Sequence, residues 1–144
     1  MAADPAASEP CPCSSRAPWS ECCGPVIAAP STTGPGAART AEALMRSRFA
    51  AFAIGDAAHL LRTWHPETRP DAAELAADLA SPEAPQWRRL LIRDVVGGAD
   101  ADDRGVVEFI GIGRGSGGRV ELHERSQFVR DGGAWLYTTG EILD

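Results

Sequence analysis

The spacing of apolar residues divides most of the chain into a helical segment followed by a strand-rich segment. From Thr40, apolar side chains recur at helical intervals through Leu44, Phe49 and Phe52. Thr40 is a suitable N-cap and Gly55 a suitable C-terminal stop, so the pattern predicts an amphipathic helix between them.

Two shorter helices are expected after Gly55. Asp56 can cap a second helix, which must end near His65 because Pro66 disfavours helical geometry in the residue before it. Asp71, with Glu74 three residues later, resembles a capping box and predicts a third helix that stops before Pro82.

After Trp87 the apolar period becomes two, which indicates strands at 87–96, 105–114, 119–130 and 134–142. Short turn-forming segments at 102–105, 115–118 and 131–133 are suitable hairpin connections. Helices followed by a run of antiparallel strands predict an α+β domain with the helices packed on one face of the sheet.

The segment before Arg39 has a different composition, with seven of the eleven prolines and all four cysteines. It reads as a disordered tail over 1–10, a cysteine-rich head over 11–27 and a flexible linker over 28–39. The rest of the chain, 40–144, is the body. Because the linker has few apolar groups, we expect head and body to fold independently, so that metal removal would disorder only the head.

The cysteines form the pattern C-x-C-x8-C-C at Cys11, Cys13, Cys22 and Cys23. Four thiolates suit tetrahedral zinc, and soft sulfur ligands also accept iron. A pair of disulfides is the alternative, disfavoured if the compartment is reducing. With all four positions filled by protein ligands, the metal would have a structural role and supply the folding free energy that the head lacks.

Charge and hydropathy exclude several classes of partner. The net charge is −6 and every basic residue is Arg, which argues against binding to DNA or other nucleic acid through a broad cationic surface. No apolar run reaches the length of a membrane span, and the first 30 residues do not look like a signal peptide. We therefore expect a cytoplasmic protein that is not in a membrane.

Residues 11–25 (CPCSSRAPWSECCGP) resemble the SEC-C metal-binding motif. Residues 40–52 (TAEALMRSRFAAF), 63–66 (TWHP), 122–128 (LHERSQF) and 135–137 resemble the YchJ family of bacterial proteins, which joins this motif to a nuclear-transport-factor-2-like (NTF2-like) domain. The resemblance implies a cone over 40–144, with three N-terminal helices packed on a curved sheet around a cavity. Where the family usually has Gly-Ser-Gly after the second cysteine, this chain has Ser14-Ser15-Arg16, which bears on the turn geometry.

Strand alternation around Leu122 and Phe128 places Glu124 and Ser126 on the inward face, and His123, Arg125 and Gln127 on the outward face. A buried carboxylate needs a partner, and the candidates are Arg46, Arg48, Arg69 and His65. Glu124 with His65 and Ser126 could form a proton-transfer site, but a structural ion pair is the favoured interpretation.

Four aromatic residues have two interpretations each, and one histidine has a single simple one. Trp64, Trp87, Trp135 and Tyr137 could line a ligand cavity, although plain core packing is the more common role for such residues. His59 lies in the middle of a predicted helix and is most simply a surface residue.

Two functions remain open. The first is a metal-stapled interaction protein, and the resemblance implies a setting in protein targeting or quality control, with a SecB-like chaperone or the ribosome as partner. The head carries Arg16 against Glu9 and Glu21, which favours a protein partner over ribosomal RNA. The alternative is a small cone-fold enzyme of the isomerase, dehydratase or hydrolase type, with a small-molecule ligand in a pocket around Glu124.

Overall fold

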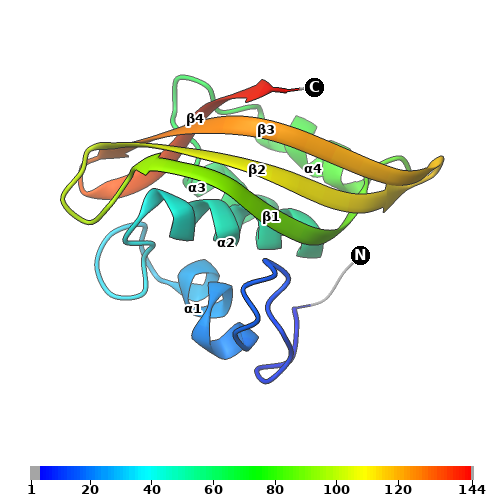
Figure 1. Ribbon diagram of the computed structural model, residues 1–144, viewed down its shortest axis with the longest axis horizontal. Coiled ribbons are helices and arrows are strands. Elements are labelled where there is room, and N and C mark those ends of the chain that lie inside the picture. The colour runs from blue at the N-terminus through cyan, green and yellow to red at the C-terminus, as the bar shows by residue number, and fades with distance from the viewer. Residues whose placement is uncertain (1–3, 144) are drawn as a thin grey trace.

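The computed structural model describes residues 4–143 and arranges them in three layers, with a helix between a sheet and the N-terminal head (Figure 1). The elements are a 3-10 turn (Trp19–Glu21), α1 (Cys23–Ala28), α2 (Ala41–Ile54), α3 (Ala57–Arg62), α4 (Ala72–Ala80), β1 (Gln86–Gly97), β2 (Arg104–Gly115), β3 (Gly118–Asp131) and β4 (Ala134–Ile142). Within the described range, every helix is too short or too polar to span a bilayer.

The three helices that follow Arg39 begin where the sequence predicts, whereas the sequence does not predict α1 of the head. The Thr40 hydroxyl accepts a hydrogen bond from the Ala43 amide at 3.0 Å, and the carboxylates of Asp56 and Asp71 cap α3 and α4 in the same way. Gly55 ends α2 with φ of 79°, a left-handed conformation that favours glycine. These local signals confirm three helices ahead of the sheet.

The four strands form an antiparallel sheet in the order β1-β2-β3-β4. Register shifts interrupt β1 at two places and the β3–β4 pairing between Gln127 and Phe128. Such bulges increase local twist and bend a strand, and the sheet curves around α2 (Figure 1). The α+β fold with helices on one face of a curved sheet is confirmed.

The head packs on the outer side of α2 and shares one hydrophobic core with the body. Buried Cys11, Trp19 and Cys23 belong to the same cluster as Leu44 and Leu90 of the body. Arg46, Arg62 and Leu90 of the body also donate hydrogen bonds to Cys13, Ile27 and Ser14 of the head. This packing argues against the expected separability, because the apolar contact comes from the head itself and not from the linker.

The predicted tail and linker both contact the rest of the chain. Residues 1–3 of the tail lie outside the described range, while the backbone oxygens of Ala7 and Glu9 accept hydrogen bonds from Ser20 and Trp19. At the far end of the linker, the Arg39 carbonyl accepts a hydrogen bond from the Trp135 indole at 3.1 Å. Composition alone does not predict these contacts.

Candidate functional site

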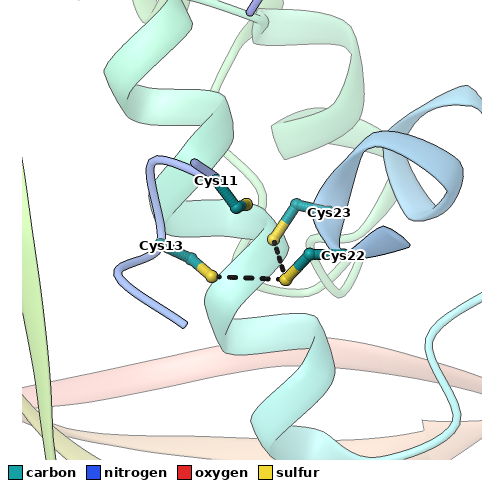
Figure 2. A group of neighbouring side chains, drawn as sticks. All are labelled: Cys11, Cys13, Cys22 and Cys23. Carbon is teal, nitrogen blue, oxygen red and sulfur yellow. Dashed lines mark hydrogen bonds between the residues drawn. The ribbon is translucent and has the colours of Figure 1, made fainter. Parts of the chain in front are cut away.

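The four cysteines meet at one point beside α2. Cys11 and Cys13 lie on the loop before the 3-10 turn, Cys22 follows that turn and Cys23 begins α1 (Figure 2). Their sulfur atoms all lie within 4.8 Å of one another. Cys22 is half-buried and the other three are buried.

This geometry fits a metal-binding set and does not fit disulfides. The Cys13 and Cys22 sulfurs are 3.5 Å apart, and the Cys22 and Cys23 sulfurs are 3.9 Å apart. A tetrahedral ion with Zn–S bonds of about 2.3 Å separates its ligands by about 3.8 Å, whereas a disulfide joins two sulfurs at about 2.05 Å. All four thiols are free, so the pair Cys11 and Cys13 and the pair Cys22 and Cys23 can bind one ion together.

The close packing of the thiols shifts their protonation. A hydrogen bond between Cys11 and Cys13 lowers the pKa of Cys13 far below its usual value and raises the pKa of Cys11 to about 11. Hydrogen bonds to Cys11 and Cys13, with burial, raise the pKa of Cys23. Cys11 and Cys23 therefore favour the protonated thiol when no cation is present, and a divalent metal at the centre would allow all four to be thiolates.

The turn between the two cysteine pairs uses left-handed backbone without glycine. Ser14 has φ of 67° and Arg16 has φ of 74°, in the segment where the YchJ resemblance leads us to expect glycine. Ser14 compensates in part, because its hydroxyl accepts a hydrogen bond from the Leu90 amide of β1 at 3.0 Å. The loss of glycine therefore leaves the turn in place, but with strain at two residues.

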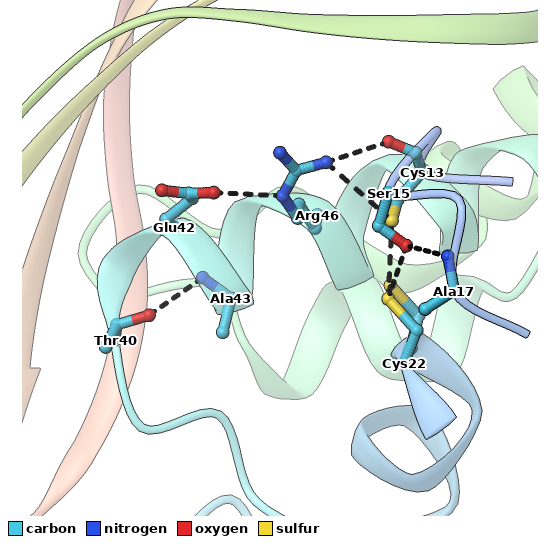
Figure 3. A network of polar contacts seen from close by, with 9 residues as sticks. Cys13, Ser15, Ala17, Cys22, Thr40, Glu42, Ala43 and Arg46 are labelled. Carbon is cyan, nitrogen blue, oxygen red and sulfur yellow. Dashed lines mark hydrogen bonds and ion pairs between the residues drawn. The ribbon is translucent and has the colours of Figure 1, made fainter. Parts of the chain in front are cut away.

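Polar side chains on both sides of the turn support the cysteines (Figure 3). The Ser15 hydroxyl lies 3.1 Å from the Cys22 sulfur and accepts a hydrogen bond from the Ala17 amide. On α2, Arg46 donates to the Cys13 carbonyl at 3.1 Å and lies 3.9 Å from its sulfur. Arg46 is one of the four candidate partners that the sequence offers for Glu124, and no local pattern indicates this contact with Cys13.

A cavity of about 230 Å³ lies between α2 and the sheet, on the side of α2 away from the cysteines. Glu124 and Ser126 both line it, as strand alternation predicts, and the Ser126 hydroxyl donates to the Glu124 carboxylate at 2.6 Å. The Tyr137 hydroxyl approaches the same oxygen at 3.4 Å. A side chain at Gly140 would collide with this carboxylate, so that glycine leaves room for it.

None of the four predicted cationic partners forms an ion pair with Glu124, and only Arg48 shares its cavity. His65 does not line the cavity: its Nε2 lies 3.6 Å from the Asp131 carboxylate, and its Nδ1 accepts from the Glu67 amide. Arg69 donates to the Trp64 carbonyl. Arg48 does line the cavity, yet forms no ion pair with Glu124. The structure thus brings Glu124 and Ser126 together and leaves His65 out, because the residues after α3 turn toward the edge of β4.

The expectation that His59 is a surface residue is wrong. Its side chain is buried, with Nε2 at 2.9 Å from the Ser47 hydroxyl and Nδ1 at 3.1 Å from Arg62. Burial, with the neighbouring cations Arg62 and Arg48, lowers its pKa to about 4. Because Arg62 only donates, Nδ1 is the acceptor and Nε2 carries the proton, which makes His59 a neutral structural link between α2 and α3.

Of the four aromatic residues with two interpretations, three line the cavity and one is core. Trp64, Trp87 and Tyr137 contribute to its wall, whereas Trp135 is buried beside the linker. Trp64 and Tyr137 also meet edge to face, with ring centres 5.3 Å apart.

Comparison with known proteins agrees with this arrangement. Residues 40–140 match the family described as YchJ, middle NTF2-like domain. A UPF0225 protein of Streptomyces coelicolor is 44% identical over 94% of this chain and 97% of its own length, and one of Corynebacterium glutamicum is 41% identical over 92% and 96%. A SEC-C motif containing protein from Rhodopseudomonas palustris, solved in solution, has 34% identity and a TM-score of 0.77, covering 94% of this chain and all of that one.

Proposed function

The chain belongs to the YchJ family of UPF0225 proteins, and from that premise we propose that it is a cytoplasmic metal-binding protein whose metal centre fastens a docking head onto an NTF2-like body. The observation that carries this proposal is the set of four free cysteine sulfurs within 4.8 Å of one another. Zinc is the expected ion, and iron is the alternative for the same thiolates.

The ion would act as a structural centre. Cys11, Cys13, Cys22 and Cys23 would fill its tetrahedral coordination, and Arg46 would offset part of the negative charge that four thiolates leave on a divalent ion. Because the coordination is complete, the metal would hold the loop and α1 together and would not activate water.

Metal content tests the first part of the proposal. We expect one zinc or iron per chain after purification under reducing, chelator-free conditions, and loss of the metal in a Cys13→Ser, Cys22→Ser variant. A Ser15→Ala variant is the control, since it removes a neighbour of Cys22 but no ligand. Purified protein with no bound metal would contradict the proposal.

The second part of the proposal is that the head binds a protein partner in protein targeting or quality control. Exposed Glu21 on the head and Glu9 just before it outnumber Arg16, which favours a basic protein surface over ribosomal RNA. Cosedimentation with ribosomes and titration against a SecB-type chaperone would separate the two expected partners. The metal-depleted chain should bind more weakly, and equal binding would exclude the head as the docking element.

A cone-fold enzyme of the isomerase, dehydratase or hydrolase type is the second candidate. The observation in its favour is the carboxylate of Glu124 in a cavity that is lined mainly by apolar groups. Because His65 lies outside, any proton transfer would depend on Glu124 with the hydroxyls of Ser126 and Tyr137. A Glu124→Gln variant that retained full turnover of a substrate would exclude this role.

A further inference from the structure

The cavity between α2 and the sheet is lined by apolar side chains on most of its surface and by polar side chains on one wall. Its apolar part comes from Met45, Phe49, Phe52, Trp87, Phe109 and Leu122. Its volume of about 230 Å³ is below the roughly 300–1,000 Å³ of sites for drug-sized molecules. A ligand of one aromatic ring with a short polar group is therefore the appropriate size.

Arg48 supplies a buried cation to the polar wall. Its side chain is 3% exposed, and Nη1 donates to the Leu60 carbonyl at 2.9 Å and to the Thr63 hydroxyl at 2.8 Å. The guanidinium lies over the rings of both Trp64 and Tyr137, at 4.7 and 4.6 Å from their centres. Among residues 4–143 no carboxylate forms an ion pair with it, so its remaining N–H groups are available to an acceptor in the cavity.

The same wall contains a hydrogen-bond acceptor, the Glu124 carboxylate. One oxygen of the Glu124 carboxylate takes both hydroxyl contacts, and the other has no hydrogen-bond partner among the described residues. A carboxylate oxygen without a partner can accept a hydrogen bond from a donor group of a ligand.

The charges of the wall select the kind of ligand. Arg48 and Glu124 balance each other, so an anionic ligand would meet the carboxylate and a cationic ligand would meet the guanidinium. We propose that the cavity binds a small uncharged aromatic molecule whose polar end carries both a hydrogen-bond donor and an acceptor, as a carboxamide or lactam does. This proposal is independent of the metal centre and requires no catalysis.

Three probes with the same ring test the proposal on the full, metal-loaded chain: benzamide, benzoate and benzamidine. They differ mainly in the charge of the polar end. Each is titrated at neutral pH and low salt while the backbone amide signals of Leu122, Glu124 and Tyr137 are followed by NMR. We expect benzamide to shift these signals with an affinity about tenfold or more above that of either charged probe. Equal or tighter binding of a charged probe, or no shift with any probe, would overturn the proposal.

A charge variant provides a second arm. In Glu124→Gln the isosteric amide removes the negative charge, so benzoate should gain about tenfold in affinity and benzamidine should lose affinity. Glu121→Gln is the matched control, because this exposed carboxylate on the same strand points away from the cavity. Unchanged benzoate affinity in a folded Glu124→Gln protein would overturn the charge argument. If that variant does not fold, the ranking of probes on the parent chain still decides.

Discussion

The Nη1 atom of Arg46 lies 3.1 Å from the Cys13 carbonyl and 3.9 Å from the Cys13 sulfur, so the first helix of the NTF2-like domain contacts a cysteine of the candidate metal centre directly. The Nε atom of the same guanidinium donates to Glu42 at 3.0 Å, which holds it in position (Figure 3). Head and body therefore meet through a polar contact as well as through their shared core.

Replacing this arginine should weaken metal binding. Arg46→Met removes the donor and the positive charge, and we expect affinity to fall about tenfold, at the low end of the 10–100-fold effects of groups that support metal ligands. Competition against a chromophoric chelator measures the change. Glu42→Gln is the control, because the amide oxygen of Gln can still accept from Arg46 Nε while the charge of Glu42 is removed and Arg46 itself is kept. Parent-like affinity in Arg46→Met would remove Arg46 from the metal site.

Metal removal should affect the body as well as the head. Cys11, Trp19 and Cys23 share a core with α2 and β1, so chelation should lower the unfolding temperature of the whole domain. In amide NMR spectra, signals of 41–54 and 86–92 should shift together with those of 11–27. Changes confined to 11–27 would instead support separable units.

Restoring glycine in the strained turn should stabilise the protein. Arg16 is exposed and has φ of 74°, so Arg16→Gly should raise the free energy of unfolding by about 1 kcal/mol. Ser14→Gly relieves similar strain but removes the hydroxyl that accepts from Leu90, so its gain should be smaller. Urea unfolding of the metal-loaded variants measures both. A destabilised Arg16→Gly would show that the backbone there is not strained.

Buried His59 should make the protein less stable in mild acid. Its pKa is about 4 in the folded chain and about 6.5 when exposed, so between these values only the unfolded chain binds the proton. Its contribution is complete above pH 6.5 and is lost as pH falls toward 4, by about 3 kcal/mol in total.

The test compares the parent with His59→Gln, because loss of metal in acid affects both proteins. The difference in unfolding free energy between them should shrink by about 3 kcal/mol from pH 7 to pH 4. A ring NMR signal of His59 that titrates near pH 6.5 would refute the neutral, buried assignment.

Truncating Glu124 should have a moderate cost. Its partners are hydroxyls and not a paired cation, so Glu124→Ala should lose about 1–3 kcal/mol, the cost of leaving buried Ser126 without its acceptor. Gln127→Ala, on the exposed face of the same strand, should stay within about 0.5 kcal/mol. Denaturant midpoints measure both variants. A loss above that range would point to a direct ion pair with Arg48 in solution.

Local sequence patterns determined the secondary structure after Arg39 and the residues of the candidate metal set. Thr40 and Gly55 bound α2 because a cap and a left-handed stop depend only on neighbouring residues. Alternation along β3 was enough to turn Glu124 and Ser126 toward the helices, since strand side chains have a period of two. The spacing of the four cysteines likewise predicted one cluster.

Tertiary structure decided which of these residues meet. The ring nitrogens of His59 are satisfied by Arg62, one turn further along α3, and by Ser47 on α2, and nothing in the sequence near His59 indicates the contact with Ser47. Arg46 supports Cys13 and Arg48 faces the cavity because residues two apart on a helix point to different sides. Periodicity assigns a residue to a face, whereas the partner on that face comes from chain segments far apart in sequence, which only the packed fold brings together.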